Sequence, residues 1–512
     1  MNVENNKTHP IKLNNNSKTN QHPTDGSWYN GEFTKFYGLN WFLATLFIVG
    51  TLAGGALVSL PSAMVMVGVF PGILLTLIFG ILFCYATVCL GRSWCIIQSN
   101  YKEYETFCRS PYMEIAYRAS GNWFRKITIA IFYINQFGTS IVFLLLASKN
   151  AWALLKVLYL TNISFCGIIL IMGLLTFTMI LFRSPVDFWG IALFAMLSTA
   201  FVSLFIIIGS EMDHSKCSVE RSIPNLSYTN LFLSIGIISY AYGGGASLSN
   251  VQHDMKRPSE FTFSAIIGFV IIIIFYIPVE IVTYYTYGDS LRYSVLDSIQ
   301  TVPIQCMINL CIGVHCLLVF VINLNPLLLH LELSLSIPNK LKIKRIILRF
   351  LIVSLIILIA LTVPTFGPIM NLLGGSTMML TSLIIPVFMY TCLKARQKMI
   401  KKDRKYLEER PSFSDLIKHS SLIDTIICCA IVIFGIISMI FITISSVHAL
   451  LTTHYAPPCF LSFLDNNVLP KEHYLAHTNC CGHYQNVTSF HRPKYFCTAP
   501  QLEFYKTNIF TN

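Results

Sequence analysis

Two ionisable side chains lie deep inside long apolar stretches of this 512-residue sequence. Glu280 belongs to FYIPVEIVTYY and His315 to CIGVHCLLVF. Ionisable groups inside a bilayer are costly and usually serve ion or proton movement. Imidazole changes charge between about pH 5 and 8, so His315 suits proton transfer, and it equally suits a neutral hydrogen bond to a neighbouring helix. Glu280 also fits a structural role near the external helix end, and Asn323 is an alternative ligand for sodium.

Glycine and proline interrupt two of the apolar stretches, the first and the sixth along the chain. The interruptions are GTLAGGALVSLPSA (50–63) and SYAYGGGASLSN (239–250). Glycine inside a helix costs roughly 1 kcal/mol relative to alanine, and in lipid the freed peptide groups need partners. The first interruption alone also fits close helix packing through the GxxxG pair Gly50 and Gly54. Two breaks at matching positions favour a solute site lined by bare peptide groups, because such pairs mark transporter sites.

Histidines and cysteines cluster near the C-terminus in HYLAHTNCCGH (473–483). Their spacing would accept zinc, but disulfides are the stronger expectation in an oxidising compartment. Four cysteines of this tail allow three pairings, and Cys166 and Cys306 near external helix ends form a further candidate pair. We therefore expect no metal and no cofactor besides a coupling ion, H⁺ or Na⁺.

Composition explains where these residues lie. Hydrophobic residues make up 54% of the chain and charged residues only 12%, against about 25% charged in soluble proteins. A membrane-spanning helix needs about 20 apolar residues. Eleven segments qualify: 41–66, 71–95, 127–155, 163–182, 187–210, 231–255, 261–286, 303–331, 346–364, 369–393 and 423–447. Only helices satisfy their own backbone over such runs, so we predict an all-α membrane protein with eleven transmembrane helices.

Lysine and arginine fix the expected orientation. With the N-terminus in the cytosol, 27 of the 36 basic residues fall on the cytosolic side, as the positive-inside rule requires. The net charge of +12 then reflects topology and the lipid bilayer rather than nucleic acid. The external side receives three glycosylation sequons, at Asn162, Asn225 and Asn486. The expected location is the plasma membrane or an endosomal, lysosomal or vacuolar membrane.

Three regions follow from this layout. Residues 1–37 are expected to form a disordered cytosolic tail, because 1–36 are polar and lack an apolar core. Residues 38–447 would form the transmembrane domain. Residues 448–512 would form a luminal or extracellular tail that contains cysteine and histidine.

Several short motifs resemble, in order, the amino acid/auxin permease family, which includes proton-coupled and vesicular amino acid transporters. They cover about residues 38–447. The matching residues are Gly54, Leu60, Pro61 and Ala63; 136–150; Gln252, Met255, Lys256 and Pro258; 276–278, Tyr287 and Gly288; His315, Asn325, Pro326 and Glu332; Pro364, Phe366, Gly374 and Pro386. The sequence departs from the family at Ala56, Gly245 and Ser249.

The resemblance implies the fold of sodium-coupled neurotransmitter symporters, two inverted repeats of five helices, plus one extra helix. It also implies secondary active transport of amino acids, with proton coupling in most branches. The positive end of a half-helix attracts anions, so we expect the substrate carboxylate at the start of the second half of helix one, near Gly55 and Ala56. The complete predicted substrate site is Thr51, Ala53, Gly54, Gly55, Ala56, Tyr240, Ala241, Tyr242, Gly244 and Gly245. Its small residues suit a small neutral amino acid.

Other functions compete with transport. An amino-acid sensor with little flux would use the same site, so only flux separates the two. An intramembrane acyltransferase using His315 and Asn325 would leave the paired glycine breaks unexplained, and a channel lacks a repeated pore motif. Motifs of soluble enzymes are absent. We therefore expect a monomeric transporter that is not an enzyme.

Overall fold

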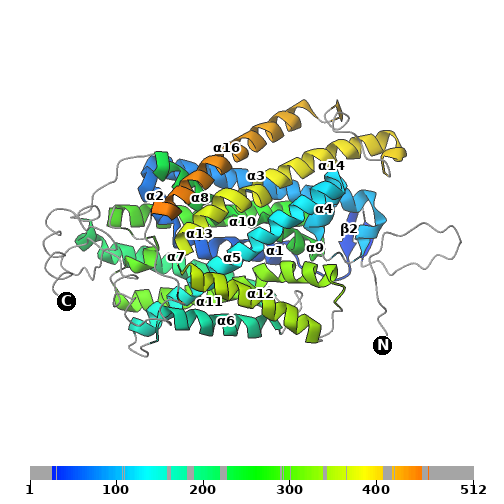
Figure 1. Ribbon diagram of the computed structural model, residues 1–512. Coiled ribbons are helices and arrows are strands. Elements are labelled where there is room, and N and C mark those ends of the chain that lie inside the picture. Colours follow the sequence, from blue (N-terminus) through cyan, green and yellow to red (C-terminus); the bar gives the residue numbers. More distant parts are fainter. Residues whose placement is uncertain are drawn as a thin grey trace.

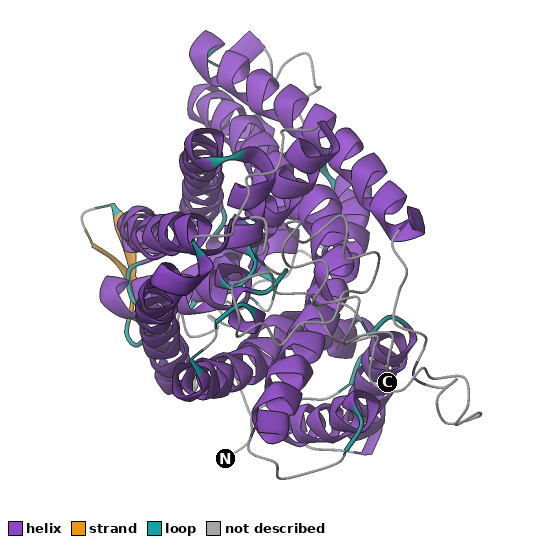
Figure 2. Cartoon of the chain, turned by 90° about the vertical axis from the view of Figure 1, so that its left-hand side faces the viewer, coloured by secondary structure: helices purple, strands orange, loops and turns teal. Residues whose placement is uncertain are grey.

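The computed structural model of the chain is a bundle of membrane-length helices with one small β-hairpin. It describes residues 26–29, 31–106, 108, 110–157, 163–181, 189–218, 228–288, 291, 293–299, 301–337, 343–364, 366–407, 418–419, 421–452 and 459. Figure 1 shows the long helices side by side, with β2 at one end of the bundle and α2 near the other. Figure 2 views the helices nearly end-on, with the two strands at the margin.

Eleven apolar helical segments follow one another in the predicted order. Their bounds are α1 Trp41–Leu57 with α2 Leu60–Val67, α3 Val69–Asn100, α5 Asn122–Val157, α6 Phe165–Leu181, α7 Trp189–Cys217, α8 Tyr228–Tyr242 with α9 Gly245–His253, α10 Phe261–Tyr287, α11 Val302–Ser334, α12 Ile343–Thr362, α13 Phe366–Leu373 with the π-helical η6 Gly374–Ile384 and α14 Ile385–Lys402, and α16 Leu422–Thr452. Among the described residues, nine are long and apolar enough to cross a membrane, the bent pair α1–α2 is a tenth, and α6 is a shorter apolar helix. The predicted all-α membrane fold is confirmed.

The helices fall into two groups of five, as predicted. The first member of each group, α1–α2 or α8–α9, is interrupted. The third members, α5 and α11, are long helices of 36 and 33 residues that pack against each other. The remaining helix, α16, lies outside both groups and packs against α8 and η6. Each group therefore contributes one broken span and one long, continuous span to the centre of the bundle.

The chain just before α1 is not the disordered tail that the sequence predicts. Strands β1 Gly26–Tyr29 and β2 Glu32–Lys35 pair antiparallel. The backbone N–H of Lys35 donates to the carbonyl of Lys256 at 2.8 Å, and the N–H of Leu39 donates to the carbonyl of Asp254 at 2.9 Å. These bonds join the entry of α1 to the residues that follow α9. The partners lie more than 200 residues away, which explains why local composition did not reveal the hairpin.

Shorter elements connect the spans. They are η1 Lys102–Glu105, α4 Pro111–Ser120, η3 Pro258–Glu260, η5 Val295–Asp297 and η7 Arg404–Leu407. The loop with η5 joins α10 to α11, and its residues Val295 and Leu296 are buried. Asp297 in this loop forms an ion pair with Lys149 of α5. The loop is thereby held against the helices rather than extended away from them.

A disulfide bond joins Cys166, in the first turn of α6, to Cys459, beyond the end of α16. The suggested pairing of Cys166 with Cys306 is wrong, because Cys306 keeps a free thiol. Both bonded residues belong to regions predicted to lie outside the cytosol, where disulfides persist. The bond therefore agrees with the orientation that the basic residues indicate.

Removing Cys459 should free one additional thiol. We expect Cys459→Ser to add one site for a polyethylene-glycol maleimide in denatured, unreduced protein, because Cys166 loses its partner. Cys306→Ser should remove one site instead, since that thiol is already free. The measurement is the gel shift of the two variants beside the native chain. The opposite pattern would mean that Cys166 pairs with Cys306.

Candidate functional site

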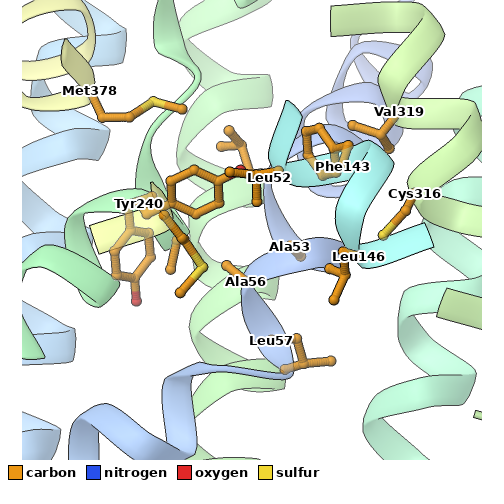
Figure 3. Packing of buried hydrophobic residues seen from close by; sticks show 14 of the residues in the cluster. Leu52, Ala53, Ala56, Leu57, Phe143, Leu146, Tyr240, Cys316, Val319 and Met378 are labelled. Carbon is orange, nitrogen blue, oxygen red and sulfur yellow. The ribbon is translucent and has the colours of Figure 1, made fainter. Parts of the chain in front are cut away.

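The first span is interrupted just beyond its glycines. α1 ends at Leu57, and α2 begins at Leu60 with a bend of 57°; Figure 3 shows the ribbon turning aside below Leu57. The second half was expected to begin near Gly55 and Ala56, but both residues belong to the last turn of α1. The expectation of a break in this stretch is met, whereas its predicted position was too early. The carbonyl end of α1, not the amide end of α2, therefore lies beside these two residues.

The glycines of α1 allow close approach instead of breaking the helix. A Cβ atom at Gly54 would overlap the imidazole of His315 on α11. A Cβ at Gly55 would lie 2.8 Å from the ring of Phe143 on α5, nearer than packed carbons tolerate. Both long helices thus contact α1 where it has no side chain.

The sixth span is interrupted at its glycine triplet, as predicted. α8 ends at Tyr242 and α9 begins at Gly245. Gly244 between them has φ +130°, a backbone conformation that strongly favours glycine. The N–H groups of Gly244 and Gly245 both donate to the hydroxyl oxygen of Ser382 in η6, at 2.9 and 3.1 Å. One side chain of the tenth span thus satisfies two peptide groups freed by the break.

Tyr276 of α10 connects the two interrupted spans. Its side chain is fully buried. The hydroxyl lies 3.0 Å from the carbonyl oxygen of Ala241 in α8 and 3.3 Å from that of Leu52 in α1. The Tyr276 hydroxyl can therefore donate a hydrogen bond to either of two carbonyl groups near the ends of two half-helices. This contact fixes α1 and α8 relative to each other.

The loop that contains η5 satisfies a further freed group. The backbone N–H of Val295 donates to the carbonyl of Val58, in the interruption of the first span, at 2.9 Å. The loop therefore reaches down to the break rather than lying only on the outer surface.

A cavity of about 40 Å³ lies where the broken spans meet α5, α11 and η6. It is lined by Thr51, Leu52, Gly55, Ala56, Thr139, Phe143, Tyr240, Gly243, Gly244, Ser247, Val319, Ile322, Asn323 and Met378. Figure 3 shows the side chains of Leu52, Tyr240, Phe143, Val319 and Met378 gathered beside α1. None of the lining residues is charged. The cavity combines apolar side chains with a few hydroxyl, amide and peptide groups.

His315 lies behind α1, outside this lining. Its ring is fully buried, and Nδ1 donates to the carbonyl of Ala195 on α7 at 3.1 Å. The hydroxyl oxygens of Ser198 and Thr199 lie 3.3 and 3.4 Å from the same nitrogen. Nε2 has no hydrogen-bond partner among the described residues and faces Gly54. The imidazole therefore connects α7 and α11 to the helix that lines the cavity.

Glu280 lies farther from the cavity, between α10 and α3. Its carboxyl group is 1% exposed, and Thr76 of α3 is 3.1 and 3.2 Å from the two carboxyl oxygens. Within the described residues no cation pairs with Glu280. A buried carboxyl group without a cation is costly, and the hydroxyl of Thr76 is the polar side-chain group that contacts this one. The carboxyl group does not reach the cavity lining.

Comparison with known proteins identifies the chain. The family described as "Transmembrane amino acid transporter protein" matches residues 38–444. The chain belongs to this family. Among individual relatives, Arabidopsis thaliana amino acid transporter AVT1D is 25% identical over 353 residues, which are 66% of this chain and 61% of that protein. Amino acid transporter AVT1B of the same plant is 26% identical over 348 residues, 66% of this chain and 62% of its own length.

Other similarities of this family member are more distant. Auxin transporter-like protein 5 of Medicago truncatula is 23% identical, over 41% of this chain and 44% of its own. Among solved structures, MhsT in complex with L-phenylalanine is 11% identical with a TM-score of 0.48, covering 79% of this chain and 98% of its own. A manganese transporter of Eremococcus coleocola is 13% identical with a TM-score of 0.47, covering 80% of this chain and 94% of its own. The chain spans about three fifths of the length of the two Arabidopsis relatives.

Half of the residues predicted to bind substrate line the cavity of this transporter-family chain. These residues are Thr51, Gly55, Ala56, Tyr240 and Gly244. The other five, Ala53, Gly54, Ala241, Tyr242 and Gly245, lie on the same segments but are not in its lining. Tyr242, for example, packs among Phe83, Phe269 and Tyr276. The two sets differ in whether they lie on the side of each segment that borders the cavity. The sequence alone did not determine which side that is.

Asn323, proposed as an ion ligand, lines the cavity, whereas Glu280 and His315 do not. The Asn323 side-chain amide donates to the carbonyl of Gln136 at 3.1 Å and lies 3.2 Å from the hydroxyl of Ser140. These contacts hold α11 against α5. Asn323 therefore contributes both to the cavity wall and to packing between the two long helices.

Several lining residues were not predicted. They are Leu52, Thr139, Phe143, Gly243, Ser247, Val319, Ile322 and Met378. The side chain of Met378 comes from η6, whose π-helical backbone places residues at positions that a regular helical count would misassign. Thr139 could have been found from the sequence by working out which face of α5 the residues of its QFGTS segment share.

Some predicted features lie outside the described residues. They are the sequons at Asn162, Asn225 and Asn486 and the HYLAHTNCCGH segment (473–483). Within the described part of the chain, no group of three or more His, Cys, Asp or Glu side chains is arranged to hold a metal ion.

The double hydrogen bond at Ser382 should be important for stability. Ser382→Ala would leave the N–H groups of Gly244 and Gly245 without that acceptor, and each buried unpaired group costs about 1–3 kcal/mol. We expect a clear fall in the melting temperature of the purified protein in detergent. Ser376→Ala is the matched control in η6, because the Ser376 hydroxyl donates to the carbonyl of Leu372 in its own span. Equal melting temperatures for both variants would contradict the role of Ser382.

Proposed function

We propose that this chain is a secondary active transporter of amino acids that works by alternating access around the interruptions of its first and sixth spans. The central observation is a single cavity bordered by both interrupted spans and by α5, α11 and η6. Membership of the amino acid transporter family supports the substrate class. The geometry supports small neutral amino acids, for the reasons given next.

Half-helix ends around the cavity offer opposite partial charges. Thr51, Gly55 and Ala56 line it from the C-terminal part of α1, where carbonyl oxygens give a negative end. Gly244 and Ser247 line it from the start of α9, where N–H groups give a positive end. We therefore propose that the substrate ammonium group binds beside α1 and the carboxylate beside α9. This replaces the sequence-based position of the carboxylate near Gly55 and Ala56.

The remaining lining limits the substrate side chain. Leu52, Phe143, Val319, Ile322 and Met378 present apolar groups, and no charged residue neutralises a charged substrate side chain. A volume of about 40 Å³ holds only about three water molecules, since each needs at least 10–15 Å³ of such space. The cavity in this conformation is therefore narrow. A small substrate requires the least movement of these side chains.

We propose the proton as the coupling ion and His315 as its acceptor. Protonation would add an N–H at Nε2, which faces Gly54 of α1 and has no partner among the described residues. A new donor there would favour a position of α1 that supplies an acceptor, so protonation and the position of α1 become linked. Glu280 is the second candidate, because its carboxyl group contacts α3 through a single threonine hydroxyl. Asn323 stands as the alternative if sodium is the coupling ion.

The proposed arrangement in the membrane follows the charge distribution. Residues 1–37 would lie in the cytosol, residues 38–447 would form the transport domain, and residues 448–512 would form an external or luminal tail. The Cys166–Cys459 bond supports this, since it needs an oxidising side. We propose a monomer in the plasma membrane or in an endosomal, lysosomal or vacuolar membrane, glycosylated on the external side.

Valine at either close-contact glycine should abolish transport. Gly54→Val would force a branched side chain into the His315 ring, and Gly244→Val would place one at φ +130° with its Cβ 2.6 Å from Leu52. The left-handed strain alone costs roughly 1–2 kcal/mol. We expect uptake of radiolabelled L-alanine into proteoliposomes to be lost while reconstituted protein is retained. Gly190→Val is the control, because nothing lies within 4 Å of a Cβ at that position. Normal uptake by both test variants would refute the site.

Proton coupling predicts a specific change in pH dependence. Uptake should rise as the external pH falls from about 7.5 to 5.5, because the proposed coupling ion is the proton and its external concentration rises. Binding events coupled by the usual 1–3 kcal/mol influence each other about 5–150-fold. We therefore expect His315→Gln to lose a stimulation of at least about fivefold by a pH gradient. Measuring Glu280→Gln in the same vesicles would show which group is responsible. Full pH dependence in both variants would exclude both groups.

A further inference from the structure

A second, smaller cavity lies on the β-hairpin side of the central one, toward the end of the bundle that we assign to the cytosol. Its volume is about 10 Å³, roughly that of one water site. It is lined by Ser110, Tyr112, Met113, Phe132, Ala246, Ser249, Asn250, Pro326 and His330. Most of this lining is apolar, and Ser110, Ser249, Asn250 and His330 are among the residues that bring polar groups to it.

The two cavities are bordered by successive turns of the same three helices. On α5, Phe132 lines the second cavity and Thr139 the central one. On α11, Pro326 lines the second cavity and Asn323, one turn earlier, lines the central one. On α9, Ser247 faces the central cavity, and the neighbouring residues Ala246, Ser249 and Asn250 line the second. A continuous strip of these helices therefore runs from one cavity to the other.

Gln136 lies between the two cavities on α5, one turn from Phe132 and nearly one turn from Thr139. Its buried side chain donates from Nε2 to the hydroxyl of Ser247 at 3.0 Å and to the carbonyl of Asn323 at 2.7 Å. Its Oε1 accepts a bond from Asn135 at 3.3 Å, which fixes the orientation of the amide. One side chain therefore joins α9 to α5 and α11 at the boundary between the cavities.

We propose that Gln136 is the cytosolic gate of the central cavity and that the second cavity is the exit chamber beyond it. This deepens the proposed transport function and depends on it for its role in the cycle. α9 has nine residues and is preceded by the interruption at Gly243 and Gly244. Breaking the bond from Gln136 to Ser247 removes the polar contact that holds this half-helix to α5, while Ser382 still holds its first residue. The rest of the half-helix can then move away from α5 and α11. The central and second cavities then become one passage.

The gate also has a connection to the substrate side. The Asn135 side-chain oxygen accepts a hydrogen bond from Thr377 at 2.9 Å. Thr377 precedes Met378, whose side chain lines the central cavity in η6. A substrate that displaces Met378 would shift η6 and, through Thr377 and Asn135, the amide of Gln136. Opening of the gate would thus follow occupation of the central site.

Thiol accessibility tests the gate without requiring transport. Ile322→Cys introduces a thiol in the lining of the central cavity. A membrane-impermeant maleimide applied to the cytosolic face in inside-out vesicles reaches this thiol only through the open gate. Peptide-level mass spectrometry distinguishes it from native cysteines. We expect Gln136→Ala to raise the labelling rate at least about fivefold, because two hydrogen bonds of ordinary strength are lost. Ser247→Ala removes one of the two acceptors and should give a smaller rise; it carries the test if Gln136→Ala does not fold.

Asn150→Ala is the matched control. Asn150 is another buried amide of α5, but it donates to the carbonyl of Leu146 in its own helix at 2.8 Å. Its removal should leave the labelling rate unchanged. Unchanged labelling in both gate variants, or an equal rise in the control, would overturn the gate, whatever the uptake assay gives. Raised labelling in a protein that takes up no L-alanine would support the gate and reject transport.

Discussion

Every peptide group freed by a helix break inside a bilayer must find a hydrogen-bond partner within the protein, since each unpaired group costs several kcal/mol. This chain meets the constraint with groups from outside the broken spans. Ser382 accepts from Gly244 and Gly245, Tyr276 donates toward Leu52 and Ala241, and Val295 donates to Val58. The breaks are therefore not loose hinges. They are stabilised by the seventh and tenth spans and by the loop that contains η5.

This constraint also explains the division between bound and movable parts. α9 is held at its start by Ser382 and at Ser247 by the amide of Gln136. Near the end of α9, the Gln252 side chain donates to the carbonyls of Gly91 and Pro258. Polar contacts of this kind can be exchanged for others with little net change in free energy. A short half-helix held by exchangeable bonds can change partners, whereas one packed only by apolar side chains would have to expose them.

The sequence predicts the helices and their interruptions because both depend on local composition. Apolar runs require helices in lipid, and glycines at matching positions indicate breaks. What it misses depends on distant partners. Gly54 and Gly55 look like a break, yet they leave space for His315 and Phe143, and the bend lies three residues later. The hairpin at 26–35 exists because of residues 254–256. Met378 enters the cavity from a π-helical segment that a regular helical count does not anticipate.

The same distinction governs the ionisable groups. Burial of Glu280 and His315 could be predicted from the apolar runs around them, but their partners could not. His315 of α11 contacts two other spans, because Gly54 of α1 leaves room for a ring whose Nδ1 donates to the carbonyl of Ala195 on α7. Glu280 contacts one hydroxyl of α3 and lies outside the cavity lining. A charge on His315 acts directly on a helix that lines the cavity, whereas a charge on Glu280 has to act through α10 and α3. That difference in position makes His315 the stronger candidate for coupling.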